Sequence, residues 1–249
     1  SDTGEGTVSP SSLTFTNSNW STSQTVTVTG VDDNTTDGNQ SYTIVLAAAS
    51  SSDSDYNNLN PSDISLSNLD DEWGGAKQTG SSGADQPYGI ALDSSTNIYV
   101  AGRTYGNLDG DSNPYSTSPD IMLLKYSFQG SLKWLKQVGD DGNYEESQGV
   151  AIDSSDNVYI TGGVKTGLNG ISSNGSTDMF LVKYNSSGTK QWTRQHGTVQ
   201  NDYGNGIAID AKGYIYIAAD GYGGIDGNTN NTGSSDIYLI KYNSSGVKQ

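Results

Sequence analysis

The sequence contains no cysteine, one histidine (His196) and only 12 lysine and arginine residues among 249. The absence of cysteine excludes a disulfide scaffold and a zinc site with cysteine ligands. A single histidine excludes a metal centre built from several histidines. No apolar run approaches the ~18 residues that a membrane-spanning helix needs. The formal net charge of −16 argues against binding to a phosphate backbone, which requires a basic surface.

The hydrophobic fraction is also low, at 32%. The apolar residues nevertheless fall into short alternating runs, such as Val26-Thr27-Val28 and Tyr42-Thr43-Ile44. Clusters of Gly, Asn, Asp and Ser separate these runs, which is the pattern of half-buried strands joined by turns. No segment shows a sustained helical period. The sequence therefore predicts an all-β protein rather than a disordered chain.

A repeat occupies the chain from residue 73 onward, and its equivalent lysines, Lys125, Lys183 and Lys241, are spaced by 58 residues. Each copy contains a Gly-Ile-Ala-Leu-Asp-like run, an Ile-Tyr-Val-like run, a run ending in Lys-Tyr and, in the complete copies, a run containing Trp. These runs predict four short antiparallel strands, which is typical of a β-propeller blade. A parallel β-helix is the alternative, but its coils are usually shorter. We expect blades at about 73–133, 134–191 and 192–249.

Three blocks of the first copy closely resemble the short bacterial β-propeller repeat (SBBP): 89–95, 97–102 and 120–126. The resemblance covers residues 73–249 in three copies and departs at Ala219, where the first two copies have Gly102 and Gly162. Known propellers need at least about four blades to close a ring. We therefore expect an open arc with unpaired sheet edges, belonging to a longer chain. The family resemblance implies a large secreted or surface protein of bacteria without an assigned reaction.

Residues 1–72 carry no copy of this repeat. The strings 5–10 and 24–33, together with the closing Asp70-Asp71-Glu72, resemble a Calx-beta domain or a closely related bacterial β-sandwich repeat. Such domains are somewhat longer than this segment, so we expect the first strands of the sandwich to be missing.

Two groups of acidic residues are candidate calcium ligands, because closely spaced loop carboxylates supply the oxygen ligands that Ca²⁺ prefers. The Calx-beta resemblance implies a site at one end of the sandwich, held by Glu5, Asp32, Asp33, Asp37, Asp70 and Asp71. In the first repeat, Asp109, Asp111 and Asn113 have the spacing of a calcium loop but lack the glycine and terminal glutamate of an EF-hand. The alternative for both groups is that Asp and Asn form turns.

We predict no catalytic residues. Glu145 and Glu146 are adjacent, so on a strand they point to opposite faces and would not flank one glycosidic bond. His196 is interpreted as an ordinary surface or half-buried residue. No nucleophile elbow, P-loop or dinucleotide motif is present. The aspartates that follow each Gly-Ile-Ala-like run are interpreted as turn formers that accept backbone N–H groups: Asp93, Asp153 and Asp210.

The expected function is that of a non-catalytic extracellular or cell-surface structural or adhesion protein, stabilised by Ca²⁺ and self-assembling. Its expected partners are other copies or further domains of the same protein, with no nucleic acid. The alternative is a lectin-like, carbohydrate-binding propeller in which the loop tyrosines Tyr105, Tyr115 and Tyr222 stack on sugars. The expected location is secreted or on the bacterial cell surface, where millimolar Ca²⁺ fills weak sites.

Overall fold

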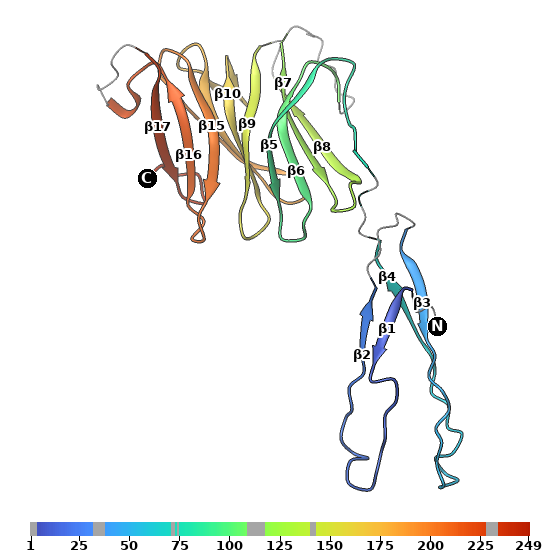
Figure 1. Ribbon diagram of the computed structural model, residues 1–249. Helices are drawn as coiled ribbons and strands as arrows, with labels where there is room; N and C mark the ends of the chain where they lie inside the picture. Colours follow the sequence, from blue (N-terminus) through green and yellow to red (C-terminus); the bar gives the residue numbers. More distant parts are fainter. Residues whose placement is uncertain are drawn as a thin grey trace. The chain divides into compact units, whose positions relative to one another are not determined.

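A computed structural model describes most of the chain and divides it into two compact units, Ser1–Ala76 and Lys77–Gln249 (Figure 1). The described residues are 4–31, 38–70, 73, 75–108, 118–139, 143–227 and 234–249. Within them, every regular element is a β-strand except one 3-10 turn, η1 (Ile225–Gly227). The predicted all-β class is therefore confirmed. No helix in these ranges is long and apolar enough to span a membrane.

The N-terminal unit contains two antiparallel pairs of short strands. The pairs are β1 (Gly6–Ser9) with β2 (Thr27–Gly30), and β3 (Gln40–Ile44) with β4 (Ile64–Asn68). Tyr42 is the one hydrophobic residue that is buried in the described part of this unit, and its ring covers Gly6. Large apolar side chains such as Trp20, at 71% exposure, remain open to solvent. The described residues of this unit therefore build only a small core.

The C-terminal unit contains three antiparallel sheets that stand side by side in chain order (Figure 1). The first sheet consists of β5 (Asp85–Leu92), β6 (Ile98–Thr104), β7 (Asp120–Tyr126) and β8 (Leu132–Val138). The second consists of β9 (Glu145–Ile152), β10 (Val158–Val164), β13 (Asp178–Tyr184) and β14 (Lys190–His196), with the small hairpin β11 (Gly167–Leu168) and β12 (Ile171–Ser172) between β10 and β13. The third consists of β15 (Asp202–Ile209), β16 (Ile215–Gly221) and β17 (Asp236–Tyr242).

The four runs predicted from the repeat are the four strands of the first and second sheets. Trp134 and Trp192 lie in β8 and β14, so each tryptophan run is the last strand of its sheet. A repeat unit counted from its tryptophan begins with the last strand of one sheet and continues with the first three strands of the next sheet. Beyond β17, the described residues add only a single antiparallel bridge, between Tyr242 and Lys248. The third sheet therefore has three full strands.

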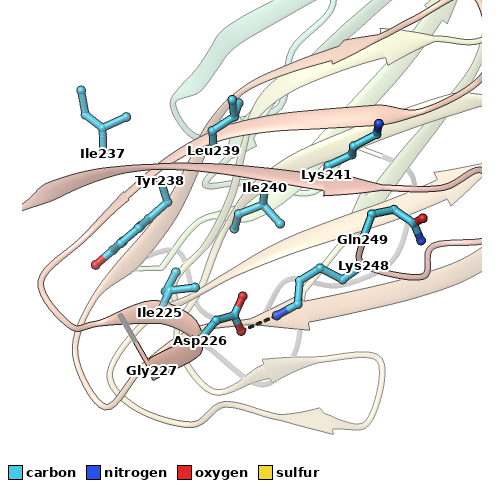
Figure 2. Close-up of a pocket in the computed structure, with 10 residues that line it drawn as sticks. All are labelled: Ile225, Asp226, Gly227, Ile237, Tyr238, Leu239, Ile240, Lys241, Lys248 and Gln249. Atoms are coloured by element: carbon cyan, nitrogen blue, oxygen red, sulfur yellow. Dashed lines mark hydrogen bonds and ion pairs between the residues drawn. The ribbon is translucent and has the colours of Figure 1, made fainter. Parts of the chain in front are cut away.

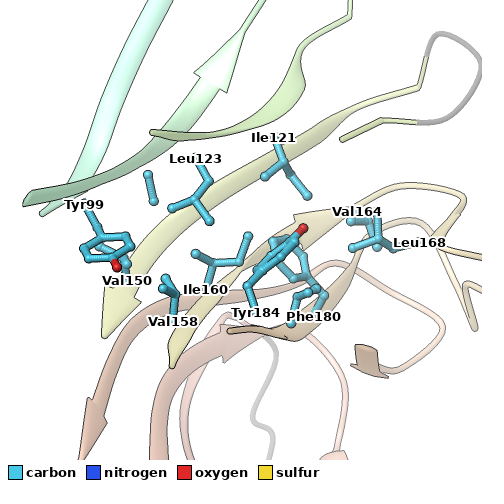
Figure 3. Close-up of a cluster of buried hydrophobic side chains, with 12 residues drawn as sticks. Tyr99, Ile121, Leu123, Val150, Val158, Ile160, Val164, Leu168, Phe180 and Tyr184 are labelled. Carbon is cyan, nitrogen blue, oxygen red and sulfur yellow. The ribbon is translucent and has the colours of Figure 1, made fainter. Parts of the chain in front are cut away.

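Two of the three core clusters lie between neighbouring sheets, and a third, smaller cluster of Met122, Leu124 and Tyr126 lies within the first sheet. Tyr99, Ile121 and Leu123 of the first sheet form one buried cluster with residues of the second, including Ile160 and Phe180 (Figure 3). A second cluster joins the second and third sheets in the same way. β13, which lies in the sheet with a neighbour on each side, carries apolar residues on both faces and is buried along almost its whole length. β7 is buried to the same extent, because Met122, Leu124 and Tyr126 form the third cluster on its other face.

The alanine that departs from the repeat is accommodated by a change on the neighbouring strand. A side chain at Gly102 or Gly162 would collide with the backbone of the strand before it, at the carbonyl of Glu146 in the second sheet. In the third sheet Ala219 pairs with Gly204, where the other two sheets have Pro87 and Ser147, and a glycine backbone can adjust its conformation more freely. The substitution therefore leaves the sheet intact.

Candidate functional site

At one end of each sheet, an aspartate carboxylate accepts hydrogen bonds that stabilise the turn between the first two strands. In the first sheet, Asp93 Oδ1 accepts hydrogen bonds from the backbone N–H of Ser95 (3.0 Å) and of Asn97 (2.9 Å). Its Oδ2 accepts the Tyr99 hydroxyl at 3.1 Å and lies 3.2 Å from Lys125 Nζ. The turn-forming role predicted from the sequence is confirmed.

The same carboxylate also joins three strands, which the sequence did not reveal. Lys125 lies 4.9 Å from the centre of the Tyr99 ring, and Trp134 packs edge-on against that ring. Burial opposes ionisation, but hydrogen bonds from Asn97 and Lys125 hold the pKa of Asp93 below its ordinary value. Lys125 Nζ and Trp134 Nε1 also donate to the Ser186 carbonyl of the second sheet, each at 3.3 Å. These groups are therefore engaged with one another and with the next sheet, so this end is structural.

The second sheet repeats this arrangement with Asp153, Tyr159, Lys183 and Trp192. In the third sheet, Asp210 accepts the hydroxyl of Tyr216 at 3.0 Å.

A different group of side chains lies at the opposite end of the inner strands, and we call it the Arg103 cluster. Its members come from both sides of the junction between the first and second sheets: Gln86, Tyr88, Arg103, Tyr105, Tyr144 and Glu146. The Arg103 guanidinium lies 5.6 Å from the ring centre of Tyr88, 5.5 Å from that of Tyr105 and 5.8 Å from that of Tyr144. Three aromatic rings thus surround one cation.

Hydrogen bonds hold the guanidinium in place. Arg103 Nη1 donates to the Tyr144 hydroxyl oxygen (2.8 Å) and to Glu146 Oε2 (2.9 Å), and Nε donates to Gln86 Oε1 (2.8 Å). Burial and the neighbouring Glu146 raise the pKa of Tyr144 above its ordinary value, so this phenol stays protonated at neutral pH. The cluster is therefore rigid and internally charge-balanced.

The accessible part of the cluster consists of the Tyr88 ring and the Gln86 side chain, which are both exposed. Tyr88 is 47% exposed, whereas Glu146 is 5% exposed and paired. The register places Gly163 and Asp220 at the positions equivalent to Arg103 in the other two sheets, so the cluster occurs at one junction only among the described residues. The arrangement offers a ring face with hydrogen-bonding groups around it, which is typical of a binding surface.

The three tyrosines named from the sequence have different outcomes. Tyr105 belongs to the Arg103 cluster. Tyr222 follows β16, is 45% exposed, and lies outside the cluster. Tyr115 lies outside the described residues. The cluster members Tyr88 and Tyr144 were not predicted, because nothing in the local sequence shows that they approach Arg103.

His196 is half-buried, as predicted, and is the last residue of β14 in the second sheet. Its Nε2 is 3.3 Å from Asp226 Oδ1, and Lys248 Nζ lies 2.5 Å from the same oxygen. Burial and Lys248 lower the pKa of His196, so it is neutral at pH 7. Asp226 and Lys248 lie beside β17 (Figure 2) and help to line a hollow of about 480 Å³, in which half of the lining residues belong to β17. The sequence did not indicate the acidic partner, which lies on another element.

Three buried acids begin strands at the same end as the Arg103 cluster: Glu145, Asp178 and Asp202. Asp178 Oδ2 accepts the Gln195 amide at 3.1 Å, and Asp202 Oδ2 accepts the Thr198 backbone N–H at 2.6 Å. Burial, together with Asp178, raises the pKa of Asp202 above its ordinary value. Glu146 pairs with Arg103 while its neighbour Glu145 is fully buried, so the two glutamates have different surroundings.

The structure describes only two of the predicted calcium ligands. Glu5 Oε2 accepts the Asn68 side-chain amide at 3.4 Å, and Asp70 Oδ2 accepts the Gly38 backbone N–H at 2.5 Å. The other predicted ligands lie outside the described residues: Asp32, Asp33, Asp37, Asp71, Asp109, Asp111 and Asn113. The described part of the chain contains no group of three His, Cys, Asp or Glu side chains suited to a metal ion. The described residues alone therefore do not make a calcium site.

Three segments, 75–109, 133–162 and 191–226, match the model of the SBBP β-propeller repeat family. The chain carries β-propeller repeats. The second and third of these segments include Trp134 and Trp192, so the family repeat, like the count from the sequence, places the tryptophan run before the Gly-Ile-Ala-like run. One repeat therefore contributes strands to two neighbouring sheets. None of the segments reaches residues 1–72, and the Calx-beta resemblance stays a prediction.

Two curated proteins are similar to this chain. One is the regulatory protein FlaEY of Caulobacter vibrioides, 28% identical over 177 residues, which covers 67% of this chain and 18% of that protein. The other is an uncharacterised WD repeat-containing protein, L264, of Acanthamoeba polyphaga mimivirus, 23% identical over 206 residues, covering 68% of this chain and 15% of that protein. The chain thus spans less than a fifth of either relative.

Proposed function

We propose that the chain is a non-catalytic structural or adhesion module of an extracellular or cell-surface protein, and that the Arg103 cluster contacts a carbohydrate. The observation that carries this proposal is the set of three tyrosine rings held around one guanidinium, with the Tyr88 ring accessible. A sugar presents an apolar C–H face and a rim of hydroxyl groups. Tyrosine supplies a rigid apolar surface at low entropic cost, and neighbouring amides supply hydrogen bonds.

The pairing within the cluster supports binding rather than catalysis. The Glu146 carboxylate accepts a hydrogen bond from Arg103 at 2.9 Å and is buried, so it is engaged within the cluster and is not presented to a ligand. A ligand would meet an aromatic face whose charges are already balanced. The repeat-family match and the relative named as a regulatory protein are in line with a non-catalytic role.

The charge of the chain narrows the ligand class. A net charge of −16 repels polyanionic polysaccharides, and the single cation of the cluster is already paired. Neutral sugars and amino sugars are therefore the proposed ligands.

Replacing Tyr88 with alanine is expected to weaken binding to a neutral or amino-sugar oligosaccharide about tenfold, because an aromatic contact of about 1.4 kcal/mol is lost. A glycan array identifies the oligosaccharide, and calorimetry measures the affinity. Tyr88→Phe keeps the ring and is expected to retain most of the affinity.

Tyr56→Ala is the matched control, since Tyr56 is also exposed (61%) but lies in the other unit. An array without signal above background, or an affinity unchanged by Tyr88→Ala, would contradict the proposal.

The proposed calcium dependence concerns the N-terminal unit. Adding millimolar Ca²⁺ to chelator-treated protein is expected to raise the melting temperature of this unit by several degrees, because a ligand that binds only the folded state stabilises it. The Asp33→Asn variant is expected to lose the shift, whereas Asp53→Asn, outside the predicted ligand set, should keep it. A melting temperature that does not respond to Ca²⁺ would remove the metal from the proposal.

A further inference from the structure

Two buried carboxylates lie side by side where the second sheet meets the third. Thr177, just before β13, and Asn201, just before β15, form a parallel bridge, and the backbone N–H of Asp202 donates to the Thr177 carbonyl at 2.7 Å. Paired residues of neighbouring strands project to the same side, and such strands are about 4.8 Å apart. Asp178 and Asp202, one residue further along each strand, therefore form the next pair.

The segment that follows β14 touches both carboxylates. A side chain at Gly197 would collide with Asp178 Oδ1. The next residue, Thr198, donates its backbone N–H and its hydroxyl to Asp202 Oδ2, at 2.6 Å and 2.9 Å. Asp178 Oδ2 in turn accepts the backbone N–H of Asn174 at 2.9 Å. One oxygen of each carboxylate is therefore held by fixed donors.

The other oxygen of each carboxylate has no donor. Asp178 and Asp202 are 1% and 0% exposed, and Oδ1 of each has no hydrogen-bond partner among the described residues. A side chain at Gly221 would collide with Asp202 Oδ1, so a glycine backbone lies beside this oxygen as Gly197 lies beside Asp178 Oδ1. A glycine Cα–H is only a weak donor. In the described part of the chain, neither carboxylate has a basic nitrogen within 4.0 Å.

A proton is the cation that fits this pair. Two adjacent negative charges out of water repel each other, which favours the uptake of a positive charge. Both Oδ1 atoms are inaccessible to water, and the described residues include no group of three His, Cys, Asp or Glu side chains suited to a metal ion. Protonation needs no added volume and removes one of the two charges. Burial and Asp178 raise the pKa of Asp202, in line with this assignment.

We propose that Asp178 and Asp202 form a proton-binding pair that makes the junction between the second and third sheets more stable in acidic than in alkaline solution. Because the folded-state pKa of Asp202 is raised, its contribution to stability is complete below the ordinary pKa of aspartate. The contribution is lost as the pH rises through the folded-state value. The pair involves neither the Tyr88 ring nor a sugar, so the proposal stands or fails separately from the carbohydrate site.

Other titratable groups near the pair do not produce the same dependence. Burial and Lys248 lower the pKa of His196, so its contribution to stability is lost as the pH falls, which is the opposite sign. Asp226 interacts with both His196 and Lys248. The titratable and charged side chains around the pair are His196 on β14, Asp226 on η1, Lys248 beyond β17, Asp236 and Tyr238 on β17, and Glu145 on β9.

The test is the melting temperature of the Lys77–Gln249 unit, measured by calorimetry from about pH 4 to about pH 8. Asp202→Asn removes one charge of the pair and keeps an oxygen for the Thr198 donors. At about pH 8 this variant is expected to melt about 2–4 °C above the wild-type chain, because the repulsion is gone. Near pH 4 the difference is expected to vanish, since the wild-type pair is then protonated.

A double variant tests whether the two aspartates act as a pair. Asp178→Asn also keeps an oxygen for its donors and is expected to give a similar rise at about pH 8. The double variant should rise no further than either single variant, because each substitution alone removes the repulsion. In carbon-13 NMR, one carboxyl signal of the wild-type chain is expected to titrate above the ordinary range of aspartate and to be absent from Asp202→Asn.

Two controls separate the pair from other carboxylates and from the histidine. Asp85 begins β5 as Asp202 begins β15, and it accepts the Ser81 backbone N–H at 2.7 Å, but it is partly exposed. Asp85→Asn is therefore expected to show no rise at about pH 8. His196→Gln is expected to keep the loss of stability with rising pH.

Three results would each overturn the proposal. The first is an Asp202→Asn variant whose melting temperature differs from that of the wild-type chain by the same amount at every pH. The second is a double variant in which the two single effects add, which indicates two independent buried charges. The third is a rise at about pH 8 on adding millimolar Mg²⁺ that is seen in the wild-type chain and lost in Asp202→Asn, which assigns the pair to a metal ion.

Discussion

Replacing Leu181 with alanine is expected to lower the free energy of unfolding of the Lys77–Gln249 unit by about 2–5 kcal/mol. Leu181 is fully buried between the second and third sheets, where it packs with Ile217 and Ile240. Truncation removes the transfer free energy of three carbon atoms and leaves a cavity that neighbouring strands fill only in part. Urea unfolding followed by tryptophan fluorescence measures the change.

The repeat provides a closely matched control, because the same residue type occupies the equivalent position of the next sheet. Leu239 occupies the position of Leu181 in the next sheet but is 76% exposed. At concentrations where the chain is monomeric, Leu239→Ala is expected to change the free energy of unfolding by no more than about 0.5 kcal/mol. Equal losses for the two variants would show that the exposed face of the third sheet is covered within one chain.

Replacing Asp153 with alanine is expected to lower the free energy of unfolding by about 1–3 kcal/mol, the cost of leaving partly buried hydrogen-bond donors without an acceptor. The carboxylate accepts the backbone N–H groups of Ser155 and Asn157 and the hydroxyl of Tyr159, and it lies 3.8 Å from Lys183 Nζ. Its loss leaves these donors without an acceptor and leaves the lysine charge uncompensated. Chemical denaturation at pH 7 measures the effect.

The pH dependence of stability gives a second test of Asp153. Burial opposes ionisation, yet the Asn157 and Tyr159 hydrogen bonds hold the pKa of this carboxyl below its ordinary value. The stabilisation is therefore complete above the ordinary pKa of aspartate, and it is lost as the pH falls through the folded-state value. Asp153→Ala should flatten the stability curve in that acidic range. An unchanged acid branch would contradict this assignment.

Asp210→Ala is the matched variant in the third sheet. Asp210 has the same turn hydrogen bonds, from Lys212 and Tyr214, but no lysine amino group lies within 4.0 Å of it in the described residues. We expect a smaller loss of melting temperature than for Asp153→Ala.

Local sequence was sufficient to predict the strands and the turns of the repeats. The strands follow from the alternation of apolar residues, and the turns follow from the aspartate after each Gly-Ile-Ala-like run. Both effects act between residues that are close in sequence, so a short stretch of sequence is enough to predict them. The Arg103 cluster was not predictable in this way. Arg103 and Glu146 are separated by 43 positions and lie on strands of different sheets, and no local pattern records which side chains meet at a junction.

The sequence by itself determined the all-β class, the repeat, the turn aspartates and the excess of negative charge. Only the tertiary structure decided which copies of a repeated residue are buried. Phe180-Leu181-Val182 and Tyr238-Leu239-Ile240 have nearly the same pattern, yet Leu181 is inaccessible and Leu239 is open to solvent. The physical reason is that the third sheet covers Leu181, whereas no described sheet covers Leu239. Hydrophobic stabilisation arises only where apolar area is removed from water, so the same residue type stabilises one sheet and not the next.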